Sequence, residues 1–178
     1  MNDDTARGAK PALTKDELDA ILSYDADAGE FTRLVTRGKY KAGTKAGYVH
    51  RHLGYVEIKV NGQAYYAHRL AHLTMTGEWP SGQMDHRNHI KWDNRWSNLR
   101  PASRAQNVYN QKGWSSSGYK CIAVYETKSF GTRFAVKVQR GDTRYQNVFG
   151  DLDNAINYRD EVIRKHDGEF AQTGHRDD

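Results

Sequence analysis

The sequence predicts an α+β protein made of two parts, and three observations predict this fold class. The chain has 178 residues, a length typical of one domain or two small ones. A β-hairpin pattern followed by helical patterns occupies the middle of the chain, and strand patterns that lead into one long helical pattern occupy the last third. A short stretch of small polar residues at 113–118 separates these two regions.

The N-terminal region begins with a loose end at residues 1–12, which are small, polar and charged. Thr14 and Glu17 have the spacing of a capping box, so we expect a helix over residues 15–23. Residues 30–35 then alternate in the manner of a strand.

A β-hairpin is predicted next. Residues 54–60 alternate between apolar and polar side chains, and residues 63–68 supply a return strand. Asn61 and Gly62 between them form the dipeptide most typical of a two-residue hairpin turn.

Two helices follow the hairpin. The first is expected over residues 68–76 and ends near a Gly-Glu-Trp-Pro sequence. The side chains expected to face inward are those of Leu70, Leu73 and Met75. Ser103 and Gln106 form a second capping box, which opens a helix to about residue 109 that carries Asn107.

The C-terminal third reads as three strands and a helix. The strands are expected at residues 121–125, 133–139 and 145–149, and the helix at 152–166. The predicted organisation is therefore as follows: a flexible N-terminus at 1–12, a first module at 13–112, a linker at 113–118, a second domain at 119–171 and a flexible tail at 172–178.

The positive charge of the chain is concentrated in its middle. Residues 39–112 carry a net charge of +8, whereas residues 1–38 carry −3 and residues 113–178 carry 0. A basic stretch with interleaved tyrosine and tryptophan suits a polyanion, because neutralising phosphates releases condensed counterions. An ordinary solvated surface has the same composition, and both interpretations stay open.

Composition also excludes some classes of protein. The mean hydropathy is −0.92, and no apolar run approaches the roughly 20 residues of a membrane-spanning helix, so we expect no membrane association. The polar, acidic N-terminus lacks the apolar core of a signal peptide, which predicts a cytoplasmic protein. The single cysteine, Cys121, permits no intramolecular disulfide.

The residues with chemical potential lie between positions 83 and 107. Asp85 and His86 are followed by Asn98 and then by Asn107 on the capped helix. This order and spacing resembles that of the HNH endonucleases, and the preceding segment from His68 to Pro80 looks like the phage homing-type group of that family. The resemblance extends over about residues 14–111.

The resemblance implies a ββα-metal module and a role for each of these residues. Asp85 and Asn107 would bind one divalent metal ion, His86 would be the general base, and Asn98 would orient His86 through its side chain or its carbonyl. Asparagine at 107, where many relatives have histidine, makes this an HNN-type site and favours Mg²⁺ or Mn²⁺ over softer metals. His89 stands where many relatives have glycine, which leaves the geometry of the loop open.

Several neighbouring residues are assigned supporting or binding roles. His68 and Arg69 are expected to support the site. The candidate phosphate contacts around the motif are Arg95, Arg100 and Arg104, and an interpretation as plain exposed charges has equal weight. A zinc site is an alternative, and its ligands would be His68, His72, His86 and His89.

Residues 117–171 resemble an AP2-type DNA-binding domain, in which a three-stranded sheet enters the major groove. The resemblance rests on Phe149 with Asp151 at the exit of the sheet and on the ending His166 to Ala171. The candidate DNA contacts are Tyr119, Lys120, Arg133, Lys137 and Arg144. Tyr125, Phe134 and Val136 are expected in the core.

The sequence thus predicts a phage-encoded, homing-type endonuclease that hydrolyses double-stranded DNA with a divalent metal in the bacterial host cytoplasm. A monomer is slightly favoured, although the sequence does not fix the oligomeric state. One alternative is a catalytically weak, sequence-specific DNA-binding protein or regulator. Another is a structural module stabilised by zinc.

Overall fold

The computed structural model describes residues 12–110, 115–171 and 173. The chain divides into two compact units, Met1–Ala102 and Ser103–Asp178, each with its own hydrophobic core. The helix α3 (Arg104–Asn110), which the sequence analysis included in the first module, is grouped with the second unit. Residues 113 and 114 of the expected linker lie outside the described residues, and in the remainder Gly118 N–H donates to the carbonyl of Ser115 at 3.2 Å.

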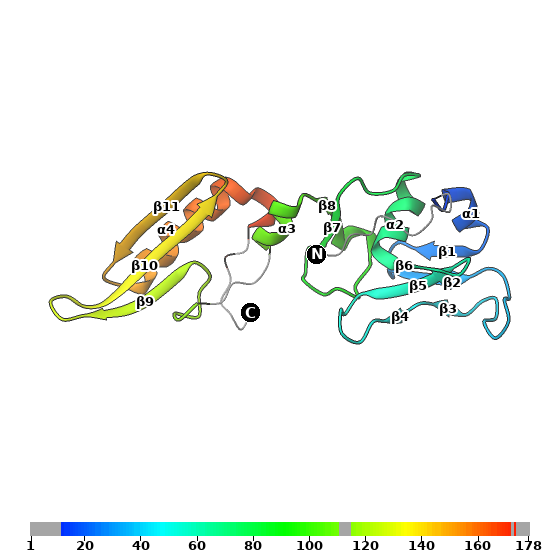
Figure 1. Ribbon diagram of the computed structural model, residues 1–178, viewed down its shortest axis with the longest axis horizontal. Coiled ribbons are helices and arrows are strands. Elements are labelled where there is room, and N and C mark those ends of the chain that lie inside the picture. The colour runs from blue at the N-terminus through cyan, green and yellow to red at the C-terminus, as the bar shows by residue number, and fades with distance from the viewer. Residues whose placement is uncertain (1–11, 111–114, 172, 174–178) are drawn as a thin grey trace. The chain divides into compact units, whose positions relative to one another are not determined.

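The first unit begins with α1 (Lys15–Asp19) and a three-stranded sheet (Figure 1). The sheet contains β1 (Leu22–Asp25), β2 (Glu30–Arg33) and β3 (Lys45–Ala46) in that order. The capping box of Thr14 and Glu17 is confirmed. The helix is shorter than expected because Leu22 already pairs with Arg33 in the sheet.

A second three-stranded sheet follows directly. Its strands are β4 (Tyr48–Val49), β5 (Val56–Val60) and β6 (Gln63–Tyr66), in the order β4-β5-β6. Val60 pairs with Gln63, and Asn61 and Gly62 both have positive φ (52° and 85°), so the predicted hairpin is confirmed. Gly47 lies between the two sheets. A Cβ at this position would lie 2.8 Å from Val56 Cγ1, and glycine avoids this clash because it has no Cβ.

The helix α2 (Ala67–Thr76) supplies the centre of the first core. Leu70 and Leu73 are buried as expected, but Met75 is 44% exposed, which corrects its predicted inward position. Met75 is two residues beyond Leu73 and therefore faces away from the buried side of the helix. The helix ends at Gly77, whose φ of 81° is left-handed.

Two short strands complete the first unit. β7 (Gln83–His86) pairs antiparallel with β8 (Leu99–Ala102), and the 3-10 helix η1 (Trp96–Asn98) precedes β8. Asp85 lies opposite Arg100, and His86 lies opposite Leu99.

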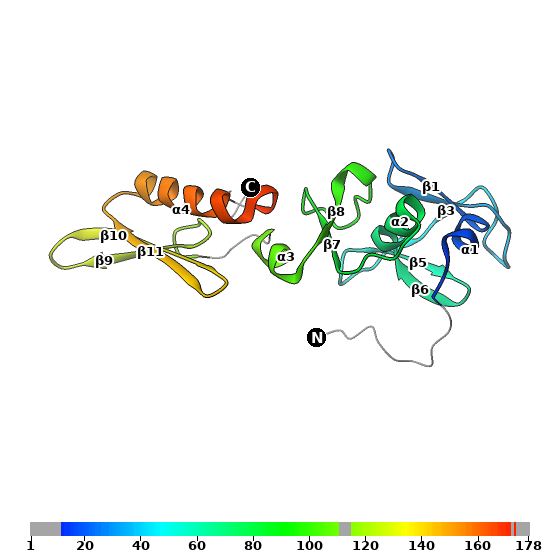
Figure 2. The same cartoon turned by 90° about the horizontal axis from the view of Figure 1, so that it is seen from above.

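The second unit contains α3 and a three-stranded antiparallel sheet with a helix on one face (Figure 2). The sheet order is β11-β10-β9, with β9 at Ile122–Thr127, β10 at Gly131–Arg140 and β11 at Thr143–Phe149. The helix is α4 (Leu152–Asp167), and the 3-10 helix η2 (Gly168–Phe170) follows it. The three predicted strands and the helix are confirmed.

One side chain of this sheet lies on the other face from that expected. Phe134 and Val136 pack in the core beneath α4, as predicted. Tyr125 is 42% exposed. Its neighbour Val124 pairs with Phe134, so Tyr125 projects from the opposite face of the sheet, and its predicted place in the core is wrong.

None of the helices in the described part of the chain has the length and apolarity needed to cross a membrane.

Candidate active site

The strand β7, paired with β8, carries two chemically active side chains at consecutive positions. Asp85 and His86 are consecutive on β7, and both are buried. Asp85 forms an ion pair with its cross-strand partner, since Arg100 Nε and Nη2 each lie 2.8 Å from Asp85 Oδ2. Arg100 is itself buried, so the structure corrects its predicted role as an exposed phosphate contact or surface charge.

His86 is held by an asparagine that the sequence analysis did not assign. Asn94 Oδ1 lies 3.2 Å from His86 Nε2, and the two residues are only 2% and 4% exposed. Asn94 Nδ2 donates to the carbonyl of Trp92 at 3.2 Å, which leaves Oδ1 to face the imidazole. An oxygen acceptor at Nε2 places the ring proton there, so that Nδ1 is the basic nitrogen of the neutral ring.

Burial lowers the pKa of His86, and the hydrogen bond that His86 donates to Asn94 partly opposes this effect. The imidazole is therefore neutral at pH 7, which is the form able to accept a proton.

Aromatic rings surround the imidazole of His86. The ring centroids of Tyr55 and His68 lie 5.9 and 5.2 Å from that of His86, and Tyr66 stacks on His68 at 5.5 Å. Burial lowers the pKa of His68 to about 3. His68 is thus an uncharged ring that packs against His86.

Arg69 contacts the segment that leads into β7. Its Nη1 donates to the carbonyl of Gly82 at 3.2 Å, and its Nη2 lies 3.4 Å from the carbonyl of Pro80. Arg69 therefore fixes the chain just before Asp85.

Asn98 organises the loop after His86. Its side chain accepts from the backbone N–H of Asn88 at 3.0 Å and donates to the carbonyl of Asp93 at 2.7 Å. Its own carbonyl accepts from Arg87 N–H at 2.9 Å. Among the described contacts none joins Asn98 to His86, so Asn98 acts on the loop rather than on the imidazole. His89 in this loop has a φ of 62°, the left-handed conformation that glycine adopts easily.

The strand β1 and the turn that follows it bind the same loop through hydrogen bonds. Tyr24 Oη donates to the carbonyl of Asn94 at 2.6 Å, and Trp96 N–H donates to the carbonyl of Ala26 at 2.9 Å. At Gly29, which has a φ of 72°, a Cβ would lie 2.3 Å from Arg95 N. Glycine is required there because the two backbones touch.

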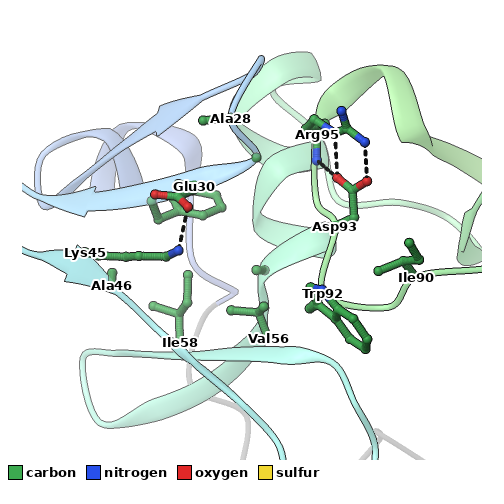
Figure 3. A pocket seen from close by; sticks show the side chains of 13 residues that line it. Ala28, Glu30, Lys45, Ala46, Val56, Ile58, Ile90, Trp92, Asp93 and Arg95 are labelled. Carbon is green, nitrogen blue, oxygen red and sulfur yellow. Dashed lines mark hydrogen bonds and ion pairs between the residues drawn. The ribbon is translucent and has the colours of Figure 1, made fainter. Parts of the chain in front are cut away.

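A pocket of about 310 Å³ lies on the first unit, beside residues 92–95 (Figure 3). Two ion pairs line it, Lys45 with Glu30 at 2.5 Å and Arg95 with Asp93 at 2.5 Å. The hydrogen bonds from Arg95 lower the pKa of Asp93 to about 2. Arg95 is exposed, so it remains available at the surface as a cation.

The remaining predicted residues belong to the second unit. Arg104 and Asn107 lie on α3. Arg133, Lys137 and Arg144 all project from the face of the sheet opposite α4, since each is out of phase with the core residues of its strand.

Two further candidates lie before β9. Tyr119 packs against the hydrophobic core, and the guanidinium of Arg159 lies 5.7 Å from its ring centroid. Lys120 is partly buried, and burial lowers its pKa.

No three histidine, cysteine or carboxylate side chains come together as a metal-binding group among the residues that the structure describes. The alternative of a four-histidine zinc site has no support there.

Comparison with protein families gives a match to the middle of the chain. Residues 65–109 match the family model described as HNH endonuclease, a segment that includes Asp85, His86, Asn98 and Asn107. The match supports an HNH nuclease. No curated protein and no solved structure matches the chain.

Proposed function

We propose that this protein is a metal-dependent endonuclease that hydrolyses phosphodiester bonds of double-stranded DNA. The observation that carries the proposal is the buried, neutral His86, held by Asn94 within the segment that matches the HNH endonucleases. A positioned neutral imidazole, with a carboxylate on the same strand, suits hydrolysis of an anionic ester, in which water must lose a proton.

In this proposal His86 is the general base. Nδ1 takes the proton from the attacking water, and the resulting imidazolium keeps its Nε2–H bonded to Asn94 Oδ1. Because the site is buried among Tyr55 and His68, bulk water does not compete for the imidazole. Asn98 acts indirectly, by holding the loop that carries Asn94.

Asp85 and Asn107 are proposed to hold one Mg²⁺ or Mn²⁺ ion. A carboxylate and an amide oxygen are the hard donors that these ions accept, and such ions keep several of their own waters. Arg100 Nε and Nη2 both contact Oδ2 of Asp85, so a metal at this carboxylate would compete with the guanidinium. When bound, the ion would act as a Lewis acid that stabilises the charge of the leaving oxygen.

The second unit is proposed to bind DNA in the manner of an AP2-type domain. Support comes from three cations, Arg133, Lys137 and Arg144, on the open face of a sheet whose other face is covered by α4. Replacing two of them in the full chain, as Lys137→Gln with Arg144→Gln, should reduce the preference for a mapped target over random DNA. A homing-type, phage-encoded enzyme acting in the cytoplasm of a bacterial host fits the resemblance of residues 14–111.

One observation favours a second candidate function, that of a DNA-binding regulator with weak catalysis. Asp85 is already neutralised by Arg100, and this ion pair competes with any metal for the carboxylate.

Nicking of supercoiled plasmid separates the two functions. The wild-type protein should nick the plasmid with Mg²⁺ and not with a chelator. His86→Ala should lower the rate by about 10² to 10⁴ while duplex affinity is kept, because a general base contributes about that much. His52→Ala, which changes an exposed histidine, is the matched control and should cleave normally. Binding without metal-dependent nicking would instead assign the chain to the regulators.

A further inference from the structure

The first unit carries a long stretch of uncompensated positive charge outside the segment that matches the nuclease family. Residues 31–56 contain six lysines and arginines and no aspartate or glutamate. Most of these cations lie in the loop between β2 and β3, together with the ends of those strands, at residues 33–45 (Figure 1). We call residues 33–45 the basic loop.

The basic loop is ordered by its own hydrogen bonds. Arg37 and Tyr40 exchange backbone hydrogen bonds of 2.8 and 3.1 Å around a tight turn, in which Gly38 has a φ of 57°. Ala42 N–H donates to Thr36 Oγ1 at 3.0 Å. A ligand that binds this loop therefore meets a preformed surface, and little ordering entropy opposes binding.

Side chains also fix the basic loop to the rest of the unit. Arg37 Nη1 donates to Asn61 Oδ1 at 2.6 Å, which ties the tip of the loop to the β5-β6 turn. Tyr40 is 50% exposed, and the cations of Arg33 and Lys39 lie 4.7 and 5.5 Å from its ring centroid. The aromatic ring thus holds two cations close together at the surface.

Three cations of the basic loop have no acidic partner among the described residues. In the part of the chain that the structure describes, no carboxylate lies within ion-pair distance of Arg37, Lys39 or Lys41, although Lys45 pairs with Glu30. Like charges held together on a rigid scaffold repel one another, and an anionic ligand relieves this repulsion. Closely spaced cations around an aromatic ring, with no acidic group among them, suit a repeated phosphate backbone better than a single carboxylate.

We infer that the basic loop is a second DNA-contacting surface, which binds backbone phosphates of duplex DNA without reading their sequence. The inference rests on the proposed function, because it names a surface through which the same substrate is held. It places part of the affinity for DNA on residues upstream of the family match at 65–109.

The test measures duplex binding by the full-length protein without Mg²⁺, by fluorescence anisotropy of a labelled random-sequence duplex at several salt concentrations. The variant is Lys39→Gln with Lys41→Gln, which keeps the Arg37–Asn61 bond and the backbone turn. The matched control is Arg164→Gln with Lys165→Gln, which removes the same charge from the last turn of α4. Circular dichroism checks that both variants are folded.

The loop variant should bind more weakly and with less dependence on salt. Each lost phosphate contact reduces the slope of log K against log salt by about 0.9, and it lowers the affinity about 8-fold at ~0.1 M salt. The loop variant should therefore lose about 60-fold in affinity and about 1.8 in slope, whereas the control should change much less.

The outcomes separate this inference from the proposed function. If the wild type nicks plasmid with Mg²⁺ but the loop variant binds like the control, the inference is wrong and the nuclease assignment stands. If the loop variant loses more affinity for double-stranded RNA than for DNA, the surface belongs to RNA and the inference is overturned. If the wild type neither binds nor nicks duplex DNA, both fail.

Discussion

The contact between Asn94 and His86 can be tested by removing the amide. In Asn94→Ala, His86 loses the amide oxygen that lies 3.2 Å from its Nε2. In the wild type this oxygen holds the ring proton on Nε2. In the variant the ring proton is free to occupy Nδ1, where it blocks the atom that must accept a proton from water. The substitution should lower the rate of cleavage and change duplex affinity little.

The burial of the pair sets the size of the effect. Both side chains are almost completely excluded from water, so the imidazole N–H would be left without a partner in the interior. Such a loss costs about 1–3 kcal/mol, which corresponds to a rate reduced about 5- to 150-fold if it falls on the productive tautomer. This reduction is smaller than the loss expected for His86→Ala.

A double-mutant cycle separates this positioning role from a general loss of structure. Single-turnover nicking with Mg²⁺ is measured for Asn94→Ala, for His86→Ala and for the double variant. Because Asn94 acts through His86, its removal should have no further effect once His86 is absent. Gln63→Ala removes an exposed side-chain amide from the same unit, and it should stay within about threefold of wild type.

Two results would refute the reasoning. The first is cleavage by Asn94→Ala at the wild-type rate, and the second is a loss of rate by the same factor whether or not His86 is present. The second result would show that Asn94 supports the fold and not the base.

Three further predictions concern stability, measured as the free energy of unfolding in urea. Arg100→Leu removes the guanidinium that neutralises buried Asp85 and should cost about 3–5 kcal/mol, much of which Asp85→Asn should restore in the double variant. Gly29→Ala should cost at least about 2 kcal/mol, because its Cβ would meet the backbone of Arg95; an unchanged stability would contradict the close approach. The unfolded chain protonates His68 near pH 6.5 but the folded chain only near pH 3, so stability should fall as the pH falls from 6.5 towards 3, and His68→Phe should flatten this dependence.

The elements with short-range signals could be predicted from the sequence. The capping boxes at Thr14 and Ser103 both form, and the Asn61-Gly62 turn sets the register of its hairpin. Each signal depends on residues within a few positions of one another, so tertiary context does not alter it. Tyr125 was misplaced because an aromatic residue in a strand fits either face, and only the pairing of its neighbour decides.

The part of the site that depends on neighbouring residues was also predictable. Asp85 and His86 are consecutive, so their placement on one strand follows from the sequence. The partner of His86 does not, because Asn94 and Asn98 are both polar residues of one loop, and only the folded loop shows which amide faces the ring. Arg100 was assigned to the surface because arginine is seldom buried, and the register of β7 and β8 places it opposite Asp85 instead.

The strand β1 and the turn after it hold the loop that carries Asn94, so residues 65–109 cannot be moved to another protein without them. Tyr24 bonds to the carbonyl of Asn94, and Phe31 and Ile58 share one hydrophobic cluster with Met84 on β7. A segment that begins at residue 65 and is grafted onto another protein would therefore lose the hydrogen bond from Tyr24 to the loop that carries Asn94. It would also expose the apolar side of its strands to water. The segment that matches the HNH endonucleases therefore depends on the upstream sheets for its packing, and a fragment made for grafting has to begin before Leu13.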